Sequence, residues 1–591
     1  MNVAFVSLFD IRAIPLRILE GCLEEKGISS TTVFFKQHSW NGGMPLFSQK
    51  ELETTGELIL SANPDLIGVS LRSCFFHHAV ELTAYLKQRA DVPVIWGGTH
   101  AIISPESCVQ HADIVCVGEG EKTIVQVCER LENNDSLAGV DNVCFWQGSE
   151  LVRGDLGSLV VDLDELPVAG IGNRAGATKV YYDGKKVFHE DPLIVANTSS
   201  YVFLSGRGCP FTCAYCSNSF LRKHFKGKGP YIRQRSVDHV LGELKHAKAS
   251  LPGLEVFSAN DEVFGMKEEW LGEFCEQYSK HIGIRFHCDM HPAYITEGRV
   301  KRLKAIGQQT MSLGIQSSSD DVRRQRYQRR TSDEMLERSL EVLHRFGIEA
   351  SFDFIFDDPL ADDDELHDSI EWLSKRHRPL NVSLYSMQYL PKTVYTERLL
   401  KDGIIAEDQV DGISKKGLYE GRVTHKLEKR SRQQAVLLKL IELFNVSFFK
   451  RKGATGYSDI RVPTWLIRLL CAMSQKSGLK GTAAILIDVL HLLAIRMRRH
   501  ASRFGFLRNL KRWGRRLGGL VRRGGVSGVS RHTRTAPHGP RPSDAEGRVP
   551  TADRMHSPAH LHGVHPAQPS PHLGQKGSLE GEVCQRATRG D

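Results

Sequence analysis

One stretch of this 591-residue chain decides how the rest is interpreted: Gly206-Arg207-Gly208-Cys209-Pro210-Phe211-Thr212-Cys213-Ala214-Tyr215-Cys216. It follows an apolar, strand-like run from Tyr201 to Ser205, so the three cysteines are expected on a loop at the end of a strand. Three thiolates are one ligand fewer than a closed zinc site or a fully ligated cubane needs, so a metal bound here keeps one open position. The alternatives are a disulfide pair with a spare cysteine, or a zinc site whose fourth ligand lies elsewhere.

The spacing Cys209-x3-Cys213-x2-Cys216, with Tyr215 directly before the last cysteine, resembles the signature of the radical S-adenosylmethionine (radical SAM) superfamily. The resemblance implies that these cysteines are the metal ligands and catalytic residues, and that Tyr215 contributes to cofactor binding. They would hold a [4Fe–4S] cluster whose fourth iron is chelated by S-adenosylmethionine. A one-electron reductant such as flavodoxin or ferredoxin would then trigger cleavage to a 5′-deoxyadenosyl radical, which abstracts a hydrogen atom from an unactivated carbon.

Cysteine usage and the first residues indicate a cytoplasmic protein. The other ten cysteines are scattered, and several lie in apolar runs where a reduced cysteine packs as a small hydrophobe. The chain starts directly with a strand pattern, Met1-Asn2-Val3-Ala4-Phe5-Val6, and shows no export signal there. Its length predicts two or three domains.

The formal net charge of +9 comes from one C-terminal segment. Arg496 to Arg523 holds eleven Lys and Arg and no acidic residue, and without it 67 basic residues face 69 acidic ones. The body of the protein is therefore nearly neutral, and no nucleic-acid partner is expected.

Residues 1–134 alternate short apolar runs with helical ones, which predicts a doubly wound, Rossmann-like α/β domain. The expected strands are Val3–Leu8, Thr31–Phe35, Leu66–Leu71, Val92–Trp96 and Ile114–Val117, with helices over Leu16–Glu25, Ala79–Arg89 and Thr123–Leu131. Gly97 and Gly98 follow a strand directly, where glycines let a ligand approach the backbone, although a tight turn has the same pattern.

Three phrases in this domain, Asn63–Ser70, Val92–Ala101 and Val117–Glu121, resemble the cobalamin-binding domain that precedes the radical domain in one class of radical SAM enzymes. The resemblance implies that Ser70, Gly97 and Gly98 contribute to cofactor binding.

Related cobalamin folds carry Asp-x-His-x-x-Gly after the first strand, and the histidine ligates cobalt. Here the corresponding residues are Asp10, Arg12 and Pro15, and an arginine cannot donate a lone pair. Two interpretations stay open: cobalamin bound without a histidine from this loop, or a fold retained after the cofactor was lost.

Residues 135–198 are expected to form a connector with a small strand-rich element. From Tyr201 the alternation resumes, so residues 199–407 are predicted to fold as a partial (β/α)6 barrel of the TIM type, with its site at the carboxyl ends of the strands. The later strands are expected at Glu255–Ser258, Arg285–Asp289, Thr310–Ile315, Ala350–Phe356 and Asn381–Tyr385, with helices over Glu268–Lys280, Glu297–Ile306, Asp333–Phe346 and Asp362–Arg376.

Family resemblance also indicates residues that hold S-adenosylmethionine. After the second barrel strand, Asn260, Asp261 and Glu262 would accept hydrogen bonds from its amino group, although an ordinary acidic loop has the same composition. After the fourth strand, Gln316 and Ser317 resemble the family's Glu-Ser, and Gln316 would bond a ribose hydroxyl.

Three further segments match the family's pattern to different degrees. The basic run Arg323–Arg330 would pair with the methionine carboxylate, or lie mostly on a solvated helix surface. Phe356–Leu360 departs from the family's Gly-x-Pro-Gly, whereas Pro391–Tyr395 resembles the phrase that closes the barrel.

The C-terminal part is expected to contain a helical region, residues 408–500, then a basic segment and a disordered tail, residues 501–591. Two apolar runs, Val462–Met473 and Thr482–Ile495, are too short to span a bilayer. With Arg496–Arg523 they would suit an interfacial segment on anionic lipid, or a helical cap with a solvated basic end.

These observations predict a cobalamin-dependent radical SAM enzyme that methylates an unactivated carbon of a small molecule, such as a lipid or natural product. A cobalamin-associated oxidative cyclase or rearrangement enzyme is the first alternative. A non-catalytic cobalamin or iron–sulfur sensor is the alternative from another class, and it would bind cofactor without cleaving S-adenosylmethionine.

Overall fold

The computed structural model describes residues 1–37, 46–355, 358–361, 365, 368–369, 372, 380–385 and 387–410. The chain divides into two compact units, Met1–Lys511 and Arg512–Asp591, and every described residue lies in the first. The predictions for residues 411–591, which include the helical region, Arg496–Arg523 and the tail, lie outside the described residues. Within the described part of the chain, no helix is long and apolar enough to cross a membrane.

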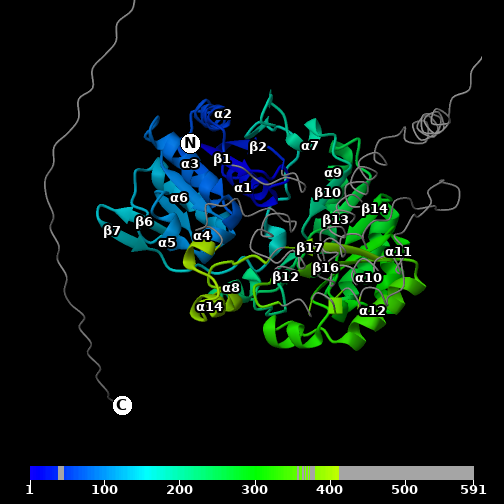
Figure 1. Cartoon of the computed structure of the whole chain (residues 1–591). Coiled ribbons are helices and arrows are strands. Elements are labelled where there is room, and N and C mark those ends of the chain that lie inside the picture. The colour runs from blue at the N-terminus through cyan, green and yellow to red at the C-terminus, as the bar shows by residue number, and fades with distance from the viewer. Residues whose placement is uncertain are drawn as a thin grey trace, which may run out of the picture. The chain divides into compact units, whose positions relative to one another are not determined.

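A nine-stranded sheet organises the N-terminal part of the chain (Figure 1). Its order is β7-β6-β5-β4-β3-β1-β2-β8-β9, and the six strands from β5 to β8 in this order are parallel. Because β1 lies inside the sheet and the chain winds outward in both directions, the predicted doubly wound fold is confirmed. The strands are β1 (Asn2–Leu8), β2 (Ser29–Phe35), β3 (Leu66–Ser70), β4 (Val94–Gly97), β5 (Ile114–Cys116), β6 (Val143–Gln147), β7 (Glu150–Arg153), β8 (Ala177–Tyr182) and β9 (Val187–Phe188).

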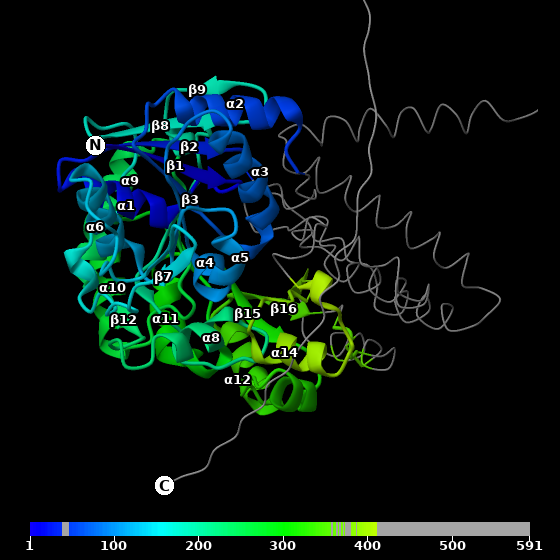
Figure 2. The same ribbon diagram turned by 90° about the vertical axis from the view of Figure 1, so that its left-hand side faces the viewer.

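Alternate residues of β1 pack on the two faces of this sheet. Val3 and Phe5 belong to the core that also holds apolar residues of α1 and α6, whereas Ala4 and Val6 belong to the core beneath α2 to α5. Figure 2 shows α1 and α6 on one side of β1 to β3, and α3 on the other. The helices are α1 (Ile14–Glu24), α2 (Gln49–Leu60), α3 (Phe76–Lys87), α4 (Thr99–Ile103), α5 (Pro105–Cys108) and α6 (Gly120–Glu132).

Residues 135–198, predicted to be a connector, contribute β6 to β9 and the short helix α7 (Pro192–Val195). Strand β8 pairs in parallel with β2, from Ser30 opposite Ala177 to Phe35 opposite Tyr182. This pairing covers the edge of β2, which would otherwise leave backbone N–H and C=O groups without partners. The connector is therefore built onto the first sheet rather than standing apart from it.

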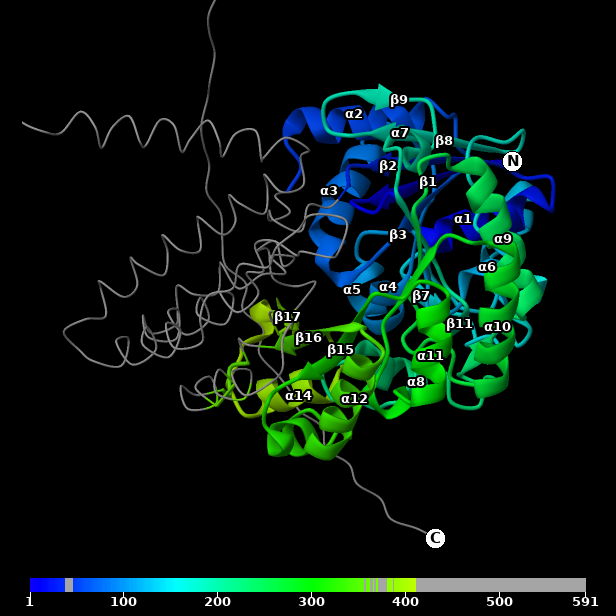
Figure 3. The ribbon, with the colours of Figure 1, turned by 90° about the vertical axis from the view of Figure 1, so that its right-hand side faces the viewer.

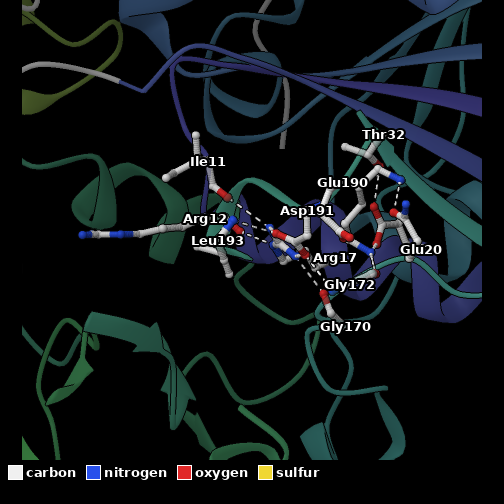
Figure 4. Close-up of polar contacts among 12 residues, drawn as sticks. Ile11, Arg12, Arg17, Glu20, Thr32, Gly170, Gly172, Glu190, Asp191 and Leu193 are labelled. Carbon is white, nitrogen blue, oxygen red and sulfur yellow. Dashed lines mark hydrogen bonds and ion pairs between the residues drawn. The ribbon is translucent and has the colours of Figure 1, made fainter. Parts of the chain in front are cut away.

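A buried ion pair fixes the connector to α1 (Figure 4). Arg17 donates from Nη1 to Asp191 Oδ2 at 2.6 Å and from Nη2 to Oδ1 at 2.9 Å, and both side chains are at most 1% exposed. The backbone N–H groups of Gly172 and Leu193 donate to the same carboxylate. The buried charge thus has four donors, which offset the cost of removing it from water.

A second buried pair lies one turn further along α1. Glu20 pairs with Lys179 of β8 at 3.0 Å and also accepts a hydrogen bond from Thr32 of β2. All three side chains are fully buried. Helix α1 is therefore joined by polar contacts to the two strands beneath it, in addition to its apolar packing.

Six further parallel strands form the predicted partial barrel, which the structure confirms. Two three-stranded sheets, β10-β13-β14 and β15-β16-β17, follow each other, and Met290 N donates to Ser312 O at 3.3 Å where they meet. Helices α9, α10 and α11 lie side by side along the first three strands (Figure 3). The strands are β10 (Ser200–Phe203), β13 (Val256–Ala259), β14 (Arg285–Cys288), β15 (Thr310–Gln316), β16 (Glu349–Ile355) and β17 (Leu380–Tyr385).

The remaining elements cover the barrel or lead into its loops. They are β11 (Gly206–Arg207), α8 (Ser217–His224), β12 (Arg233–Gln234), α9 (Val237–Ser250), α10 (Glu268–His281), α11 (Glu297–Ala305), α12 (Asp333–Arg345) and α14 (Val394–Lys401). Most of the helix predicted over Asp362–Arg376 lies outside the described residues.

The expectation that most of the run Arg323–Arg330 lies on a solvated helix surface is wrong for Arg323 and Arg329. Arg323 is fully buried and donates to the carbonyls of Ser317, Ser318 and Thr331, and Arg329 is also buried. The exposed half of the run consists of Arg324, Gln325, Gln328 and Arg330. The less exposed residues have partners far along the chain, since Tyr327 and Arg326 bind Asp358 and Arg329 binds Cys213, and the run's own sequence does not reveal these partners.

Candidate functional site

The cysteine loop starts from the two-residue ladder of β11 with β12 and ends where α8 begins. A Cβ on Gly206 would lie 2.6 Å from the carbonyl oxygen of Arg233, so a larger residue does not fit there. Gly208 has a φ of 91°, and a Cβ there would lie 2.2 Å from the carbonyl oxygen of Tyr231. Both glycines are therefore required to seat the loop against β12.

All three cysteines line one cavity of about 230 Å³, beyond the carboxyl ends of β13 and β14. Their thiols are free, which contradicts the disulfide interpretation. Among the described residues, no group of three His, Cys, Asp or Glu is close enough to hold a single metal ion. Thiols spread around a cavity of this size suit a multi-iron cluster better than one zinc ion.

Burial keeps the thiols of Cys209 and Cys216 protonated when no cation is present. It raises the pKa of Cys209 to about 11, with smaller contributions from the neighbouring Cys216 and Cys213, and it also raises the pKa of Cys216. Metal binding would therefore release protons from the loop.

Arg329 lies beside the cysteines, although its sequence position gave no specific indication of this. Its Nη1 donates to Sγ of Cys213 at 3.5 Å. Burial opposes the charge, but the nearby Tyr215 and Cys213 raise the pKa of Arg329 overall. Gly314 makes room for it, since a Cβ there would lie 3.3 Å from the guanidinium. The cavity thus contains a fixed positive charge at a thiol.

His291 forms another wall of this cavity. Its ring stacks on Phe211 of the cysteine loop with centroids 3.8 Å apart, and its Nε2 lies 3.3 Å from Oγ1 of Thr331. Burial, with the charge of Arg329, lowers the pKa of His291 to about 3. The imidazole is therefore neutral, and Ala293 N and Thr331 Oγ1 hold its two ring nitrogens in place.

The structure separates the three polar residues predicted after the second barrel strand. Glu262 lines the cysteine cavity, whereas Asp261 accepts hydrogen bonds from the N–H and hydroxyl of Ser205 at 3.0 and 2.7 Å. Burial raises the pKa of Asp261 to about 7. Asn260 is exposed and donates its N–H to Phe203 O. Only Glu262 of the three is placed at the cavity wall.

Gln316 ends β15 in an unusual backbone conformation. Its φ is 68°, and Ser317 N donates to Ile315 O at 2.9 Å, so residues 315–317 form a tight three-residue turn. A non-glycine residue in this region is strained, and such strain concentrates at functional sites. The turn places Gln316 at the wall of a second, larger cavity, described next. Ser317 lines neither that cavity nor the cysteine cavity, and its hydroxyl accepts a hydrogen bond from Ser319 N.

A larger cavity of about 500 Å³ lies where the first sheet faces the barrel. Tyr215, Cys216 and Asp353 line both this cavity and the cysteine cavity, so the two spaces adjoin. The loops and helix α4 that follow β3 and β4 contribute Arg72, Ser73, Cys74, Thr99 and Ile103, and the barrel adds Ser217, Gln316, Ile355, Tyr385, Met387, Gln388 and Leu390.

A third cavity, of about 130 Å³, lies at the carboxyl ends of β3, β4 and β5. The predicted Ser70, Gly97 and Gly98 line it, together with Gly118 and Glu121. No histidine is among the described residues that line this cavity or the larger one. Arg12, which occupies the position of the family's histidine, is exposed, and its guanidinium cannot donate a lone pair to cobalt.

Asp358 lies in the segment that departs from the family's Gly-x-Pro-Gly, and its side chain is buried. Its carboxylate accepts hydrogen bonds from Tyr327 at 2.8 Å, from Tyr395 of α14, and from Arg326 at 3.2 Å. These contacts attach the closing helix of the barrel to the loop after β16. The preceding Phe356 and Asp357 lie outside the described residues.

Comparisons with known proteins agree with this geometry. Residues 203–373 match the family model of the radical SAM superfamily, and residues 3–128 match that of the B12 binding domain. The chain is 22% identical over 327 residues to an uncharacterized methyltransferase of Pyrococcus horikoshii, covering 54% of this chain and 66% of that protein. It is 25% identical over 220 residues to the anaerobic magnesium-protoporphyrin IX monomethyl ester cyclase of Synechocystis sp., covering 36% and 39%.

A solved structure resembles the fold over most of the chain. The cobalamin-dependent S-adenosylmethionine radical enzyme OxsB, with aqua-cobalamin and S-adenosylmethionine bound, matches with a TM-score of 0.54. The match has 15% sequence identity and covers 83% of this chain and 72% of that one. The chain spans less than two thirds of the length of each curated relative described above.

The two matched domains define a class in which a B12-binding domain precedes a radical SAM domain. The chain is a radical SAM enzyme of this cobalamin-binding class. Its cofactors are a [4Fe–4S] cluster, S-adenosylmethionine and cobalamin. The residues present fit these groups, since three free thiols surround one cavity and small residues line the cavity of the first sheet.

Proposed function

We propose that this enzyme transfers a methyl group to an unactivated carbon of a small molecule. The supporting observation is the 500 Å³ cavity, which residues of the N-terminal domain and of the barrel line and which adjoins the cysteine cavity through Tyr215, Cys216 and Asp353. A substrate there would be within reach of both cofactor sites, which are at the carboxyl ends of their respective strands.

When bound, the cluster and S-adenosylmethionine supply a 5′-deoxyadenosyl radical, and cobalamin supplies a methyl group. The chain's own contribution is to bind and orient the substrate and to shield it from water. Ile103, Ile355 and Leu390 give the larger cavity apolar walls that exclude water, while Tyr215 and Gln316 offer polar contacts near the cysteines. This composition favours an apolar or amphipathic substrate, such as a lipid or natural product.

In the same proposal, Cys209, Cys213 and Cys216 ligate the cluster, and Tyr215, Glu262 and Gln316 help to bind S-adenosylmethionine. Asn260, Asp261 and Ser317 would support binding of S-adenosylmethionine indirectly, by holding the loops that carry Glu262 and Gln316. Ser70, Gly97 and Gly98 would contact cobalamin.

The test is incubation of anaerobically reconstituted protein with methyl-deuterated S-adenosylmethionine and a cell extract, followed by mass spectrometry. Methylation yields a labelled metabolite together with S-adenosylhomocysteine and 5′-deoxyadenosine. Turnover without label in any metabolite and without S-adenosylhomocysteine would contradict the proposal. A sensor would bind the cofactors and cleave no S-adenosylmethionine at all.

The match to the anaerobic cyclase favours oxidative ring closure as the second candidate. Cyclisation transfers no methyl group, so 5′-deoxyadenosine would be the only product from S-adenosylmethionine. The ratio of S-adenosylhomocysteine to 5′-deoxyadenosine, measured in the same incubation, separates the two reactions.

We also propose a cytoplasmic enzyme that receives single electrons from a flavodoxin or ferredoxin. Association of Arg496–Arg523 with anionic membranes remains a prediction from the sequence. Truncation after residue 495 should leave cluster assembly intact and weaken binding to anionic vesicles; equal binding of the two proteins would contradict the membrane role.

A further inference from the structure

An ion-pair cluster joins the first sheet to the start of the cysteine loop. We call Glu119, Glu121, Arg207 and Arg233 the bridging cluster. Arg207 donates from Nη1 to Glu119 Oε1 at 2.9 Å and from Nη2 to Glu121 Oε1 at 2.5 Å. Arg233 donates to both oxygens of Glu119, at 2.8 and 2.9 Å. These four residues hold β11 and β12 against the loop that begins α6.

Glu119 is the centre of the cluster. Arg207 and Arg233 stand directly opposite each other in the β11–β12 ladder, where two like charges repel. Glu119 compensates both, and it also accepts the N–H of Val160 at 2.9 Å. Although burial opposes ionisation, its hydrogen bonds with Arg233 and the charge of Arg207 lower the pKa of Glu119. Both carboxylate oxygens of Glu119 thus have hydrogen-bond donors within the protein.

Glu121 is different, because one of its oxygens is not used. Oε1 binds Arg207, whereas Oε2 is buried and has no hydrogen-bond partner among the described residues. The residue is 7% exposed and lines the cavity of the first sheet. A buried carboxylate oxygen without a donor costs stability unless a ligand satisfies it. The amide N–H groups of a corrinoid are donors of the required kind.

The other end of the same contact reaches the metal site. Arg207 lies between Gly206 and Gly208 and is two residues ahead of Cys209. Since both glycines are packed against β12, the backbone there has little freedom, and a shift of Arg207 would move the first cysteine. One ion pair, Arg207 with Glu121, therefore links the wall of the 130 Å³ cavity to a proposed ligand of the cluster.

We propose that Arg207 is a positioning residue that couples the two cofactor sites: a corrinoid that engages Glu121 holds Arg207 and thereby places Cys209 for the cluster. This inference rests on the proposed function for the identity of the ligand. By reciprocity, the assembled cluster strengthens corrinoid binding to the same degree.

The test measures this coupling directly by titrating hydroxocobalamin into protein with a reconstituted cluster and into the cluster-free variant C209A/C213A/C216A. In otherwise unchanged protein, the cluster is expected to tighten the Kd by roughly five- to 150-fold, the usual range of coupling between sites. In Glu121→Gln and Arg207→Gln the ratio should fall towards one, and Arg207→Lys should restore part of it. The cluster's electron paramagnetic resonance line shape should respond to cobalamin only where coupling remains.

Glu268→Gln is the matched control, because Glu268 also pairs with two arginines, Arg299 at 2.6 Å and Arg302, but on the outer helices of the barrel. It should keep the full ratio. Hydrogen exchange of residues 206–216 in cofactor-free protein should rise in Glu121→Gln and not in Glu268→Gln, which tests the positioning without any cofactor.

An unchanged Kd ratio in Glu121→Gln, with folding confirmed by circular dichroism, would overturn the coupling alone. Failure of the starting protein to bind hydroxocobalamin would overturn both the coupling and the cobalamin part of the proposed function. If binding and coupling are found but no methyl label is transferred, the inference stands and the proposed reaction fails.

Discussion

Nη1 of Arg329 donates a hydrogen bond to Sγ of Cys213 at 3.5 Å, from a position that is 9% exposed. A fixed cation and N–H donor next to a cluster ligand stabilises the more negative, reduced state of an iron–sulfur centre. If Cys213 ligates the cluster as proposed, we expect Arg329 to raise the reduction potential at which the first electron enters.

Replacing Arg329 with Gln should lower the reduction potential of the cluster by roughly 60 mV, a tenfold change for a one-electron couple. Arg329→Lys should retain most of the potential because it keeps the charge. Redox titration followed by electron paramagnetic resonance is the measurement. Arg324→Gln is the control, since the Arg324 side chain is 62% exposed; an equal shift in both variants would contradict the assignment.

Gly208 should be irreplaceable, for reasons of backbone geometry. In Gly208→Ala the new Cβ would meet the carbonyl oxygen of Tyr231 at 2.2 Å, so the cysteine loop must move and iron binding should be largely lost. Gly227→Ala is the comparison, because Gly227 has a similar φ of 81° but a Cβ added there would have no other atom within 4 Å. It should cost only about 1 kcal/mol and keep its iron. Iron content after anaerobic reconstitution decides between them.

The buried pair of Arg17 with Asp191 should dominate the stability of the first sheet. Asp191→Ala leaves an unpaired buried guanidinium and should cost about 3–5 kcal/mol in urea unfolding. Glu24→Ala removes the partner of Arg174, a pair of 2.9 Å whose side chains are about one third exposed, and should cost less than about 1 kcal/mol. Similar losses in the two variants would show that burial of the pair is unimportant.

His100 should make the protein less stable in mild acid. Its Nδ1 lies 2.8 Å from Oγ of Ser73, and burial, with the charge of His77, lowers its pKa to about 4. The unfolded chain takes up a proton near pH 6.5 while the folded one does so only near pH 4, so stability is lost as pH falls through this window. The loss attributable to His100 is at most about 3 kcal/mol.

Urea unfolding between pH 7 and 4 tests this. The variant His100→Asn should lose less stability over that range than the parent protein. The remaining slope would come from other groups, including His291. Parallel curves for the two proteins would contradict the role of His100.

Much of the architecture could be predicted from local patterns. The apolar runs at β1, β3 and β15 and the amphipathic pattern of α12 depend on each segment's own residues, because periodicity reports which faces are buried. The cysteine motif predicted the metal site for the same reason, since its ligands lie within eight residues.

Partnerships between distant residues were decided only by the tertiary structure. The pairing of β8 with β2 joins residues nearly 150 positions apart, and Arg329 reaches Cys213 across 116 positions. In the sequence, Glu119 and Glu121 belong to a segment, Val117–Glu121, that resembles the cobalamin-binding domain. In the structure they bind Arg207 from the other half of the protein. The sequence by itself determined the fold class and placed three cysteines on one loop as predicted ligands. A charged side chain, in contrast, has the same local signature whether it faces water or a buried partner. Only the tertiary structure decided which charges meet, because that depends on how the N-terminal domain packs against the barrel.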